Sequence, residues 1–245
     1  MFALSTIEAQ GGESLRVIEH QDRWALAVVF SGRLLVPCGD PELLRLAGPL
    51  TRRWRLLIGD VDAGDAALSH VTDGQGLVVH DQRFMTVDPV RVPAPEALSD
   101  PGLRLAERPD LDALTDLAVR LHVDDQFGPD PGVVGWRGYR QRLDMGLRQR
   151  LVWCVGPVGA PVCKVERAVS SARWGVQLAG IVVDDGNRHE ALGRRAVATA
   201  VRHVLDEFDG RPVSLHVRAA NTRAIDAYRA AGFVDREAWR LAVYS

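Results

Sequence analysis

The sequence predicts an α/β protein in which helices cover a mixed sheet. Between residues 177 and 233 the apolar residues change from strand spacing to helical spacing, and then repeat that change. Earlier in the chain, four prolines between Asp88 and Pro101 divide a shorter N-terminal part from a longer C-terminal part. We therefore expect a C-terminal domain built on a strand–helix–strand unit, preceded by a smaller α/β domain.

The boundaries of the two domains follow from the prolines. We expect an N-terminal domain at residues 1–88, a proline-rich linker at 89–101 and a C-terminal domain at 102–245. The first predicted N-terminal element is a hairpin of Arg23–Phe30 and Arg33–Pro37 around Ser31-Gly32. A helix at Pro41–Leu50, with Asp40 as N-cap, a strand at Trp54–Ile58 and a helix at Asp62–His70 follow. The last element is a second hairpin of Gly76–His80 and Arg83–Val87.

The first half of the C-terminal domain has a strand, two helices and two more strands. The spacing of apolar and polar residues predicts the first strand at Leu103–Glu107 and the two helices from the cap Asp110 to Val123 and at Trp136–Leu147. The two further strands are predicted at Leu151–Val155 and Val162–Ala168.

The strand–helix–strand unit follows. Gln177–Val183 ends in a β-branched run that is typical of a strand, and the polar residues 184–190 predict a loop. Apolar residues recur at helical spacing from Ala191 to Leu205, and Gly210 and Pro212 end this helix.

The chain then returns to strand spacing. Val213–Val217 alternates as a half-buried strand, and Asn221 is a favourable N-cap for the helix Thr222–Ala231. Gly232 ends this helix, and Phe233–Tyr244 supplies one or two closing strands.

Composition narrows the class of protein. The 245 residues are 47 % hydrophobic and 25 % charged, as expected for a globular protein, and the net charge of −2 predicts no attraction to nucleic acid or to membranes. No apolar run reaches the roughly 20 residues of a membrane span. Three cysteines without metal-like spacing fit a reducing cytoplasm, and no metal or catalytic-triad pattern is visible.

The loop before the long helix is suited to an anion. Its backbone N–H groups and the positive end of the helix face whatever lies beyond the strand tip. The junction from Arg188 to Gly193 has small residues at its fourth and sixth positions, which lets the backbone approach a phosphate closely. A pyrophosphate is the anion that this arrangement favours.

The same junction resembles a known signature. Arg188-x-x-Ala191-x-Gly193 is similar to the acetyl-CoA motif of the GNAT (GCN5-related) N-acetyltransferases, with Ala191 where Gly is usual. The more specific match is Asn221-x-x-Ala224-x-x-x-Tyr228-x-x-x-Gly232-Phe233, which resembles the second CoA motif of that family. The resemblance covers about Leu103 to Ser245.

The resemblance implies the acyl-CoA N-acyltransferase fold with acetyl-CoA as cosubstrate. In that fold the sheet opens between the strands that correspond to Trp174–Val183 and Val213–Val217. The backbone of Ile181, Val182 and Val183 would pair with the pantetheine amides. The pyrophosphate would lie on the junction, and Asn221 would orient the cofactor as well as cap its helix; the implied junction residues are Arg188, His189, Glu190, Ala191, Leu192, Gly193 and Arg194.

The resemblance also suggests catalytic groups. Tyr228 is the candidate donor of a proton to the departing CoA thiolate, and the alternative is a tyrosine that packs its ring in the core. Glu166 shares a strand face with Lys164 and is the candidate base, the alternative being a solvated carboxylate or an ion pair. His122, Asp124 and Asp125, at the end of the first helix, are weaker candidates for binding the acceptor, the alternative being an ordinary polar helix end. His216, on the strand beside the opening, is a candidate of the same rank.

Two functions follow from this reading. The first is an acetyl-CoA-dependent N-acetyltransferase that transfers acetyl to a primary amine by direct attack in a ternary complex. The acceptor, a small molecule or a protein amine, is left open, and so is a homodimer. The second is a catalytically degenerate CoA-binding or regulatory protein of the same fold, in which the altered phosphate loop has lost catalysis.

The N-terminal part has a possible relation to the same fold. Its element order is that of a half-sized, cofactor-free relative, as in some actinobacterial members with a divergent N-terminal half. Cys163-Lys164-Val165-Glu166 and Gln177-Leu178-Ala179-Gly180 resemble strand motifs of those members.

Overall fold

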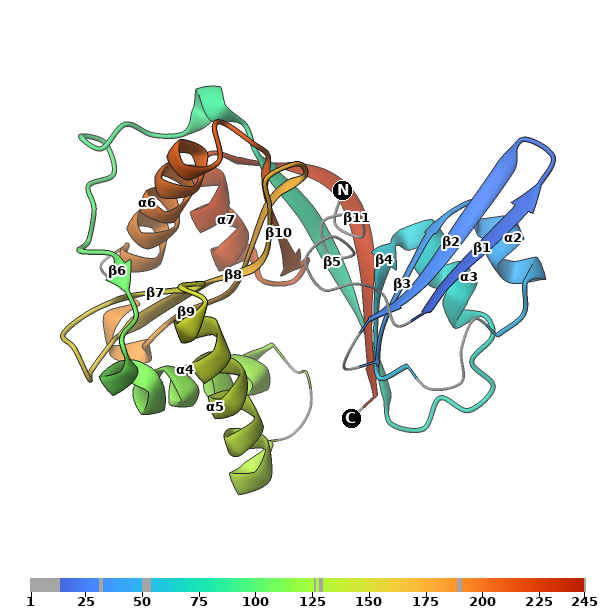
Figure 1. Cartoon of the computed structure of the whole chain (residues 1–245), viewed down its shortest axis with the longest axis horizontal. Helices are drawn as coiled ribbons and strands as arrows, with labels where there is room; N and C mark the ends of the chain where they lie inside the picture. The colour runs from blue at the N-terminus through green and yellow to red at the C-terminus, as the bar shows by residue number, and fades with distance from the viewer. Residues whose placement is uncertain are drawn as a thin grey trace. The chain divides into compact units, whose positions relative to one another are not determined.

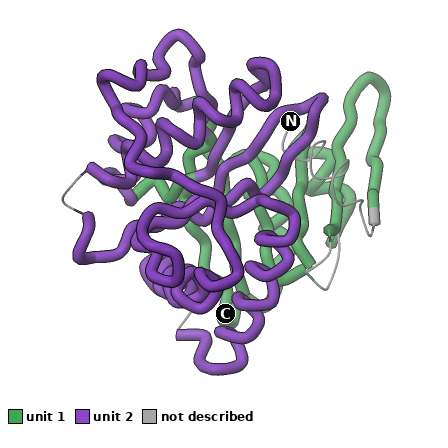
Figure 2. The backbone as a smooth tube through the Cα atoms, turned by 60° about the vertical axis from the view of Figure 1, so that its left-hand side comes forward, with its two compact units in different colours: residues 1–84, 217–220, 236–245 green, residues 85–216, 221–235 purple. Residues whose placement is uncertain are grey.

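A computed structural model describes residues 14–30, 33–49, 54–125, 127, 130–188 and 191–244 (Figure 1). The chain forms two compact units that are discontinuous in sequence (Figure 2). Unit 1 comprises residues 1–84, 217–220 and 236–245, and unit 2 comprises residues 85–216 and 221–235. The linker and the two-domain division of the chain stay predictions.

Unit 1 is an α/β unit with its helices on one sheet face. Its elements are β1 (Ser14–His20), β2 (Arg23–Phe30), β3 (Leu34–Gly39), α2 (Pro41–Leu46), β4 (Leu56–Asp60), α3 (Val61–Leu68), most of β5 (Leu77–Val87) and most of β11 (Phe233–Tyr244). β1, β2 and β3 are antiparallel neighbours, β3 and β4 are parallel, and β4 and β11 are antiparallel. Ala25 packs against Leu43 and Leu44 of α2 and against Ala63 and Ala66 of α3.

Local sequence signals explain the start of α2. The Asp40 carboxylate accepts hydrogen bonds from the backbone of Glu42 and Leu43, which confirms the predicted cap, although the helix ends at Leu46 and not at residue 50. The predicted second hairpin is wrong, because β5 runs without a turn. The carbonyl oxygen of Asp81, in the middle of the expected turn, accepts a hydrogen bond from the Ala219 amide instead.

Unit 2 contains the strand–helix–strand segment. Its elements are β6 (Arg104–Leu105), α4 (Leu111–Asp124), α5 (Gly132–Arg148), β7 (Val152–Val155), β8 (Cys163–Ser171), β9 (Gly175–Val183), α6 (Leu192–Glu207), β10 (Val213–Arg218, through His216) and α7 (Thr222–Ala230), with short 3-10 turns at Pro89–Arg91, Arg108–Asp110 and Asp185–Asn187. The strands lie in the order β10-β9-β8-β7-β6. β6 to β9 are antiparallel neighbours, and β9 and β10 are parallel. This arrangement confirms the predicted α/β class with a mixed sheet.

Helices cover both faces of the strands in unit 2 (Figure 1). On one face, Leu114 and Leu117 of α4 and Leu143 of α5 form a core with Val152 and Cys154 of β7. On the other face, α6 packs against β8 and β9. No helix in the described ranges is long and apolar enough to cross a bilayer.

The proline-rich segment is bound to α6. Arg202 donates hydrogen bonds to the carbonyl oxygens of Pro93 and Leu98, both at 3.0 Å. Arg195 donates to the carbonyl oxygens of Ser99 and Asp100 at 3.1 and 3.3 Å. Within unit 2 the segment is thus held against a helix by several backbone contacts.

Candidate active site

The two parallel strands of unit 2 part soon after they meet. β9 and β10 share only two register pairs, Val213 with Val176 and Ser214 with Gln177. Beyond Gln177, β9 continues to Val183 and remains paired with β8 on its other side, so it has left β10. Among the described residues of unit 2, the strands therefore open between the two segments for which the resemblance implied an opening.

A β-bulge interrupts β9 within this opening. Glu166 of β8 pairs with Ala179 and Lys164 pairs with Val182, so two β9 residues, Gly180 and Ile181, oppose the single residue Val165. Gly180 has a φ of +56°, a conformation that favours glycine. A bulge takes backbone groups out of the ladder, which makes N–H donors available to a ligand. Ile181 and Val183 are half-buried and Val182 is buried.

The tip of α6 lies against the end of β9. A Cβ atom built on Gly193 would lie 3.1 Å from the Val183 Cγ2, closer than an ordinary van der Waals contact, so the helix tip lies directly against the strand end. The first amides of this 16-residue helix, at Leu192, Gly193 and Arg194, therefore lie beside the strand end. An anion bound there meets unsatisfied N–H groups and the positive end of the helix dipole.

Ala191 differs from the expected geometry. The sequence predicted a helical residue, but Ala191 precedes α6 with φ +52° and ψ +19°, in the left-handed region. A side chain in this conformation costs about 1 kcal/mol or more relative to glycine. His189 and Glu190, the other predicted members of the loop, lie outside the described residues.

Arg188 is part of an ion-pair network that stabilises the loop between β9 and α6. Its guanidinium donates to the Val183 carbonyl oxygen at 3.2 Å and pairs with the carboxylates of Asp124 and Asp185, each at 2.9 Å. Arg120 of α4 pairs with Asp184 at 2.6 Å, and this hydrogen bond lowers the pKa of the Asp184 carboxyl. The loop is thus tied to α4 and β9, and the charge of Arg188 is largely balanced.

Arg194 is in a different position from Arg188. Its side chain is exposed, and it forms no ion pair or hydrogen bond with the residues that the structure describes. Among the described residues, Arg194 therefore adds a second cation near the α6 tip.

Tyr228 and Asn221 lie on α7. The Asn221 side chain accepts a hydrogen bond from the Ala224 amide at 3.1 Å, which confirms its role as a cap. Tyr228 is only 8 % exposed, and its ring lies 6.0 Å from the Phe233 ring. Burial, with a smaller contribution from the negative charge of Asp125, raises the pKa of the Tyr228 phenol above its ordinary value of 10. At neutral pH the group is a protonated hydrogen-bond donor.

Glu166 is held between two cations. It forms an ion pair with the fully buried Lys164 and a second one with Arg142 of α5, whose Nη1 lies 2.8 Å from Oε2. Burial alone would raise the pKa of Glu166, but the attraction of Lys164 and Arg142 outweighs burial and leaves that pKa lowered. Glu166 is therefore a carboxylate with weak affinity for a proton, as in the ion-pair reading of the sequence.

The weaker candidates all have partners. The Tyr139 hydroxyl oxygen lies 2.8 Å from His122 Nδ1, and the Asp124 carboxylate accepts a hydrogen bond from Arg188. The Gln177 Nε2 lies 3.3 Å from His216 Nδ1. Sequence reasoning missed Arg142 and the role of Gln177 next to His216. Both depend on contacts between residues at least 24 positions apart, for which the sequence has no local signal.

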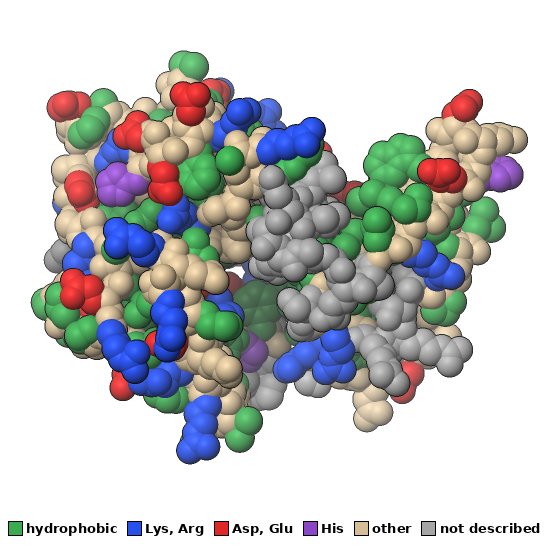
Figure 3. All heavy atoms as spheres, in the orientation of Figure 1, with side chains coloured by type: hydrophobic (Ala, Val, Ile, Leu, Met, Phe, Trp, Pro, Cys, Tyr) green, Lys and Arg blue, Asp and Glu red, His purple; other side chains and the backbone are tan. Residues whose placement is uncertain are grey.

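Basic side chains gather over the helices α4 and α5 in the space-filling view (Figure 3). Most of those contributed by α5 are paired: Arg140 with Asp112 at 2.7 Å, Arg142 with Glu166, and Arg148 with Asp144 at 2.8 Å. This surface is therefore close to neutral. Among the described residues, no group of His, Cys, Asp or Glu side chains is arranged to hold a metal ion.

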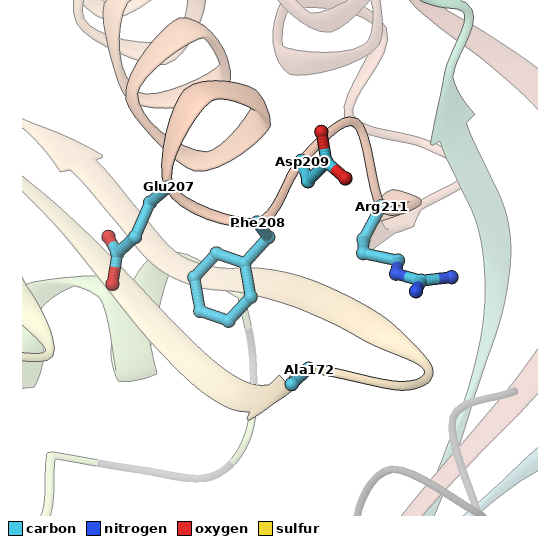
Figure 4. Close-up of a pocket in the computed structure, with 5 residues that line it drawn as sticks. All are labelled: Ala172, Glu207, Phe208, Asp209 and Arg211. Carbon is cyan, nitrogen blue, oxygen red and sulfur yellow. The ribbon is translucent and has the colours of Figure 1, made fainter.

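A separate pocket of about 310 Å³ lies at the other end of α6 (Figure 4). It is lined by Ala172, Glu207, Phe208, Asp209 and Arg211. A helix of this length spans about 24 Å, so the pocket is remote from the α6 tip. Both oxygens of Glu207 are bound by Arg167 at 2.8 Å. None of the predicted site residues lines this pocket, and we assign the chemistry to the opening between β9 and β10.

Comparisons with solved structures support the fold. A GNAT-family acetyltransferase from Colwellia psychrerythraea aligns with a TM-score of 0.61 at 11 % identity, over 90 % of this chain and 81 % of that one. A GCN5-related N-acetyltransferase from Kribbella flavida aligns with a TM-score of 0.57 at 15 % identity, over 100 % and 93 % of the two chains. A putative GNAT acetyltransferase from Novosphingobium aromaticivorans gives 0.54 at 18 % identity, over 89 % and 88 %.

At these identities the similarity shows the fold. No curated protein sequence matches the chain. The sequence does match the acetyltransferase (GNAT) family over residues 118–233, which include α5, the bulged strand, the α6 tip and α7. Residues 118–233 of this chain are therefore an acetyltransferase domain of the GNAT family.

Proposed function

We propose that this protein is an N-acetyltransferase that uses acetyl-CoA and acts on a primary amine. The observation that carries the proposal is the parting of β9 from β10 next to the tip of α6. The opening offers backbone groups to an extended chain, and the helix tip offers N–H groups to a diphosphate. These two features match the two ends of a CoA molecule.

The residues present fit this ligand. The amides of Leu192, Gly193 and Arg194 would hold the diphosphate, with Arg194 adding charge-assisted hydrogen bonds. The backbone of Ile181–Val183 would pair with the pantetheine amides as an added strand. An N–H freed by the bulge at Gly180 and Ile181 would stabilise negative charge on the thioester carbonyl oxygen.

Bound acetyl-CoA supplies an activated thioester, and its C–S bond breaks as the amine nitrogen forms the new C–N bond. Tyr228 is the proposed proton donor to the departing sulfur, because it is a protonated phenol at neutral pH. Glu166 remains the candidate base from the sequence. Its ion pairs with Arg142 and Lys164 make it a weak one.

Direct attack in a ternary complex is favoured over transfer through an acetylated cysteine. Cys154 and Cys163 of unit 2 are buried, and burial raises the pKa of each thiol to about 12. A thiol with such a pKa is not a nucleophile at neutral pH. We also propose that the protein works in the reducing cytoplasm, since all three cysteines are free thiols.

A CoA-binding protein without catalysis is the second candidate. Ala191 stands where the resembled motif usually has Gly, which favours this candidate, because a side chain there limits how closely the loop backbone approaches a diphosphate. The proposal is tested by calorimetric titration with acetyl-CoA, followed by a thiol-release assay with a panel of primary amines. Binding with thiol release supports the enzyme. Binding without release for every amine supports the second candidate, and absence of binding contradicts both.

A further inference from the structure

Buried polar side chains lie on the sheet face that packs against α4 and α5. Glu166 of β8 is on this face, because its register partner in β7 is Val152, a member of the α4–α5 core. Its partner in β9 is Ala179, and Gln177 lies two residues before Ala179 on the same side of the strand. Polar groups on a buried sheet face cost free energy unless they have partners, so they require an explanation.

Gln177 lacks a complete set of partners among the described residues. It is 9 % exposed, and its side-chain nitrogen lies 3.3 Å from His216 Nδ1 of β10. Its side-chain oxygen is buried and has no hydrogen-bond partner among the residues that the structure describes. A buried carbonyl oxygen left unsatisfied costs free energy, and a ligand N–H is one group that can satisfy it.

The position of Gln177 along β9 places it beyond the thioester. Gln177 forms the last register pair with β10, so it lies at the narrow end of the opening. At about 3.3 Å per residue, it is roughly 20 Å from Val183, where the helix tip would hold the diphosphate, with the bulge between them. A second substrate that attacks a thioester near the bulge would therefore meet Gln177.

We propose that Gln177 binds the acceptor amine, its side-chain oxygen accepting a hydrogen bond from the amine N–H. His216 is a positioning residue in this arrangement, because its ring nitrogen accepts from the Gln177 amide and orients the oxygen. The inference rests on the proposed function. Beyond that function, it identifies the part of the opening that the acceptor occupies and the group that binds the acceptor nitrogen.

The first test observes the side chain directly. Protein labelled with ¹⁵N is titrated with n-butylamine and with tyramine, in the presence and absence of CoA. The Gln177 side-chain NH₂ signals are identified by their loss in a Gln177→Met variant. We expect these signals and the His216 ring signals to shift saturably with amine. Signals that do not move with either amine overturn the inference.

The second test separates acceptor binding from cofactor binding. With the amine that the enzyme acetylates fastest, Gln177→Met is expected to raise the KM for the amine at least 10-fold and to change acetyl-CoA affinity less than 2-fold. Gln177→Glu keeps an accepting oxygen and is expected to restore much of the amine KM. The matched control is Ser170→Ala, which removes another unpartnered buried polar atom from the neighbouring strand β8.

The outcomes distinguish the inference from the proposed function. Equal effects of Gln177→Met and Ser170→Ala, or an equal loss of acetyl-CoA affinity in Gln177→Met, contradict a role in acceptor binding. If the wild-type protein does not bind acetyl-CoA in calorimetry, the proposed function fails, whatever the amine titration shows. If acetyl-CoA binds and the Gln177 side-chain signals do not shift when amine is added, only the inference fails.

Discussion

Glu166 occupies the space that a side chain at Gly180 would need. A Cβ atom on Gly180 would lie 2.8 Å from the Glu166 carboxyl carbon and 2.8 Å from the Lys164 Nζ. The absence of a side chain at Gly180 and the ion pair between Lys164 and Glu166 are therefore parts of one arrangement. The bulge in β9 and the buried charges of β8 depend on each other.

The first prediction concerns Gly180. Gly180→Ala is expected to destabilise the protein by about 2–4 kcal/mol, because it adds a left-handed alanine and displaces a buried ion pair. Chemical denaturation followed by circular dichroism measures the change. The control is Gly138→Ala in α5, where a Cβ meets nothing within 4 Å and a gain of about 0.5–1 kcal/mol is expected. A Gly180→Ala protein as stable as wild type would show that the bulge is not required.

The second prediction concerns Tyr228. Tyr228→Phe is expected to lower kcat by roughly 100-fold or more, the usual size of a general-acid contribution, with acetyl-CoA affinity unchanged. Because burial raises the pKa of Tyr228 above 10, the wild-type rate should show no loss up to about pH 10 from ionisation of this residue. Steady-state kinetics and calorimetry measure both effects. Tyr244→Phe, a change in unit 1, is the control, and unchanged turnover in Tyr228→Phe removes the residue from the mechanism.

The third prediction concerns the phosphate loop. Ala191→Gly is expected to stabilise the protein by about 1 kcal/mol, because glycine adopts a positive φ without a steric cost. The control, Ala198→Gly inside α6, should destabilise it by about 1 kcal/mol or more. Thermal unfolding of both variants measures the difference. Equal destabilisation of the two would mean that Ala191 is not left-handed in solution.

The fourth prediction separates two arginines at the α6 tip. Arg194→Ala is expected to weaken acetyl-CoA binding roughly 10- to 100-fold, since a charge-assisted hydrogen bond to an ion contributes about 1.5–3 kcal/mol, and to leave stability unchanged. Arg188→Ala should instead lower stability, because Arg188 holds Asp124, Asp185 and the Val183 carbonyl. Calorimetry and denaturation distinguish the two. The prediction fails if Arg194→Ala binds acetyl-CoA as tightly as wild type.

The fifth prediction is a pH dependence that arises at Asp110. Burial alone would raise the pKa of Asp110, but hydrogen bonds from Arg104 and from the backbone of Glu107 and Gly159 lower it to about 2 from 3.8. A lowered carboxyl pKa contributes stability above the unfolded value and loses it as the pH falls through the folded one. This contribution, about 2 kcal/mol, should therefore be complete above about pH 4 and disappear towards pH 2.

Asp110→Asn tests the assignment. The variant should be less stable than wild type at pH 7, and the difference should shrink as the pH falls from 4 to 2. Denaturation midpoints across this range measure it. A difference that does not depend on pH would place the effect in packing and not in charge.

The local signals of the sequence determined much of unit 2. The strand at Gln177–Val183, the helix that follows it and the cap at Asn221 are all found close to their predicted places. Each depends on residues within a few positions of one another, such as the Asn221 side chain and the Ala224 amide. Spacing and capping are local physics, and a sequence displays them directly.

The charge and conformation of individual site residues were decided only by tertiary structure. Glu166 is paired because the chain brings Arg142 to it from 24 residues away, and Gln177 meets His216 across 39 residues. Ala191 takes a left-handed conformation although alanine favours a helical one. Burial and hydrogen-bond partners set the pKa values of the site residues and leave the Gln177 side-chain oxygen without a partner among the described residues. Burial and partners come from packing between distant segments, which no local pattern encodes.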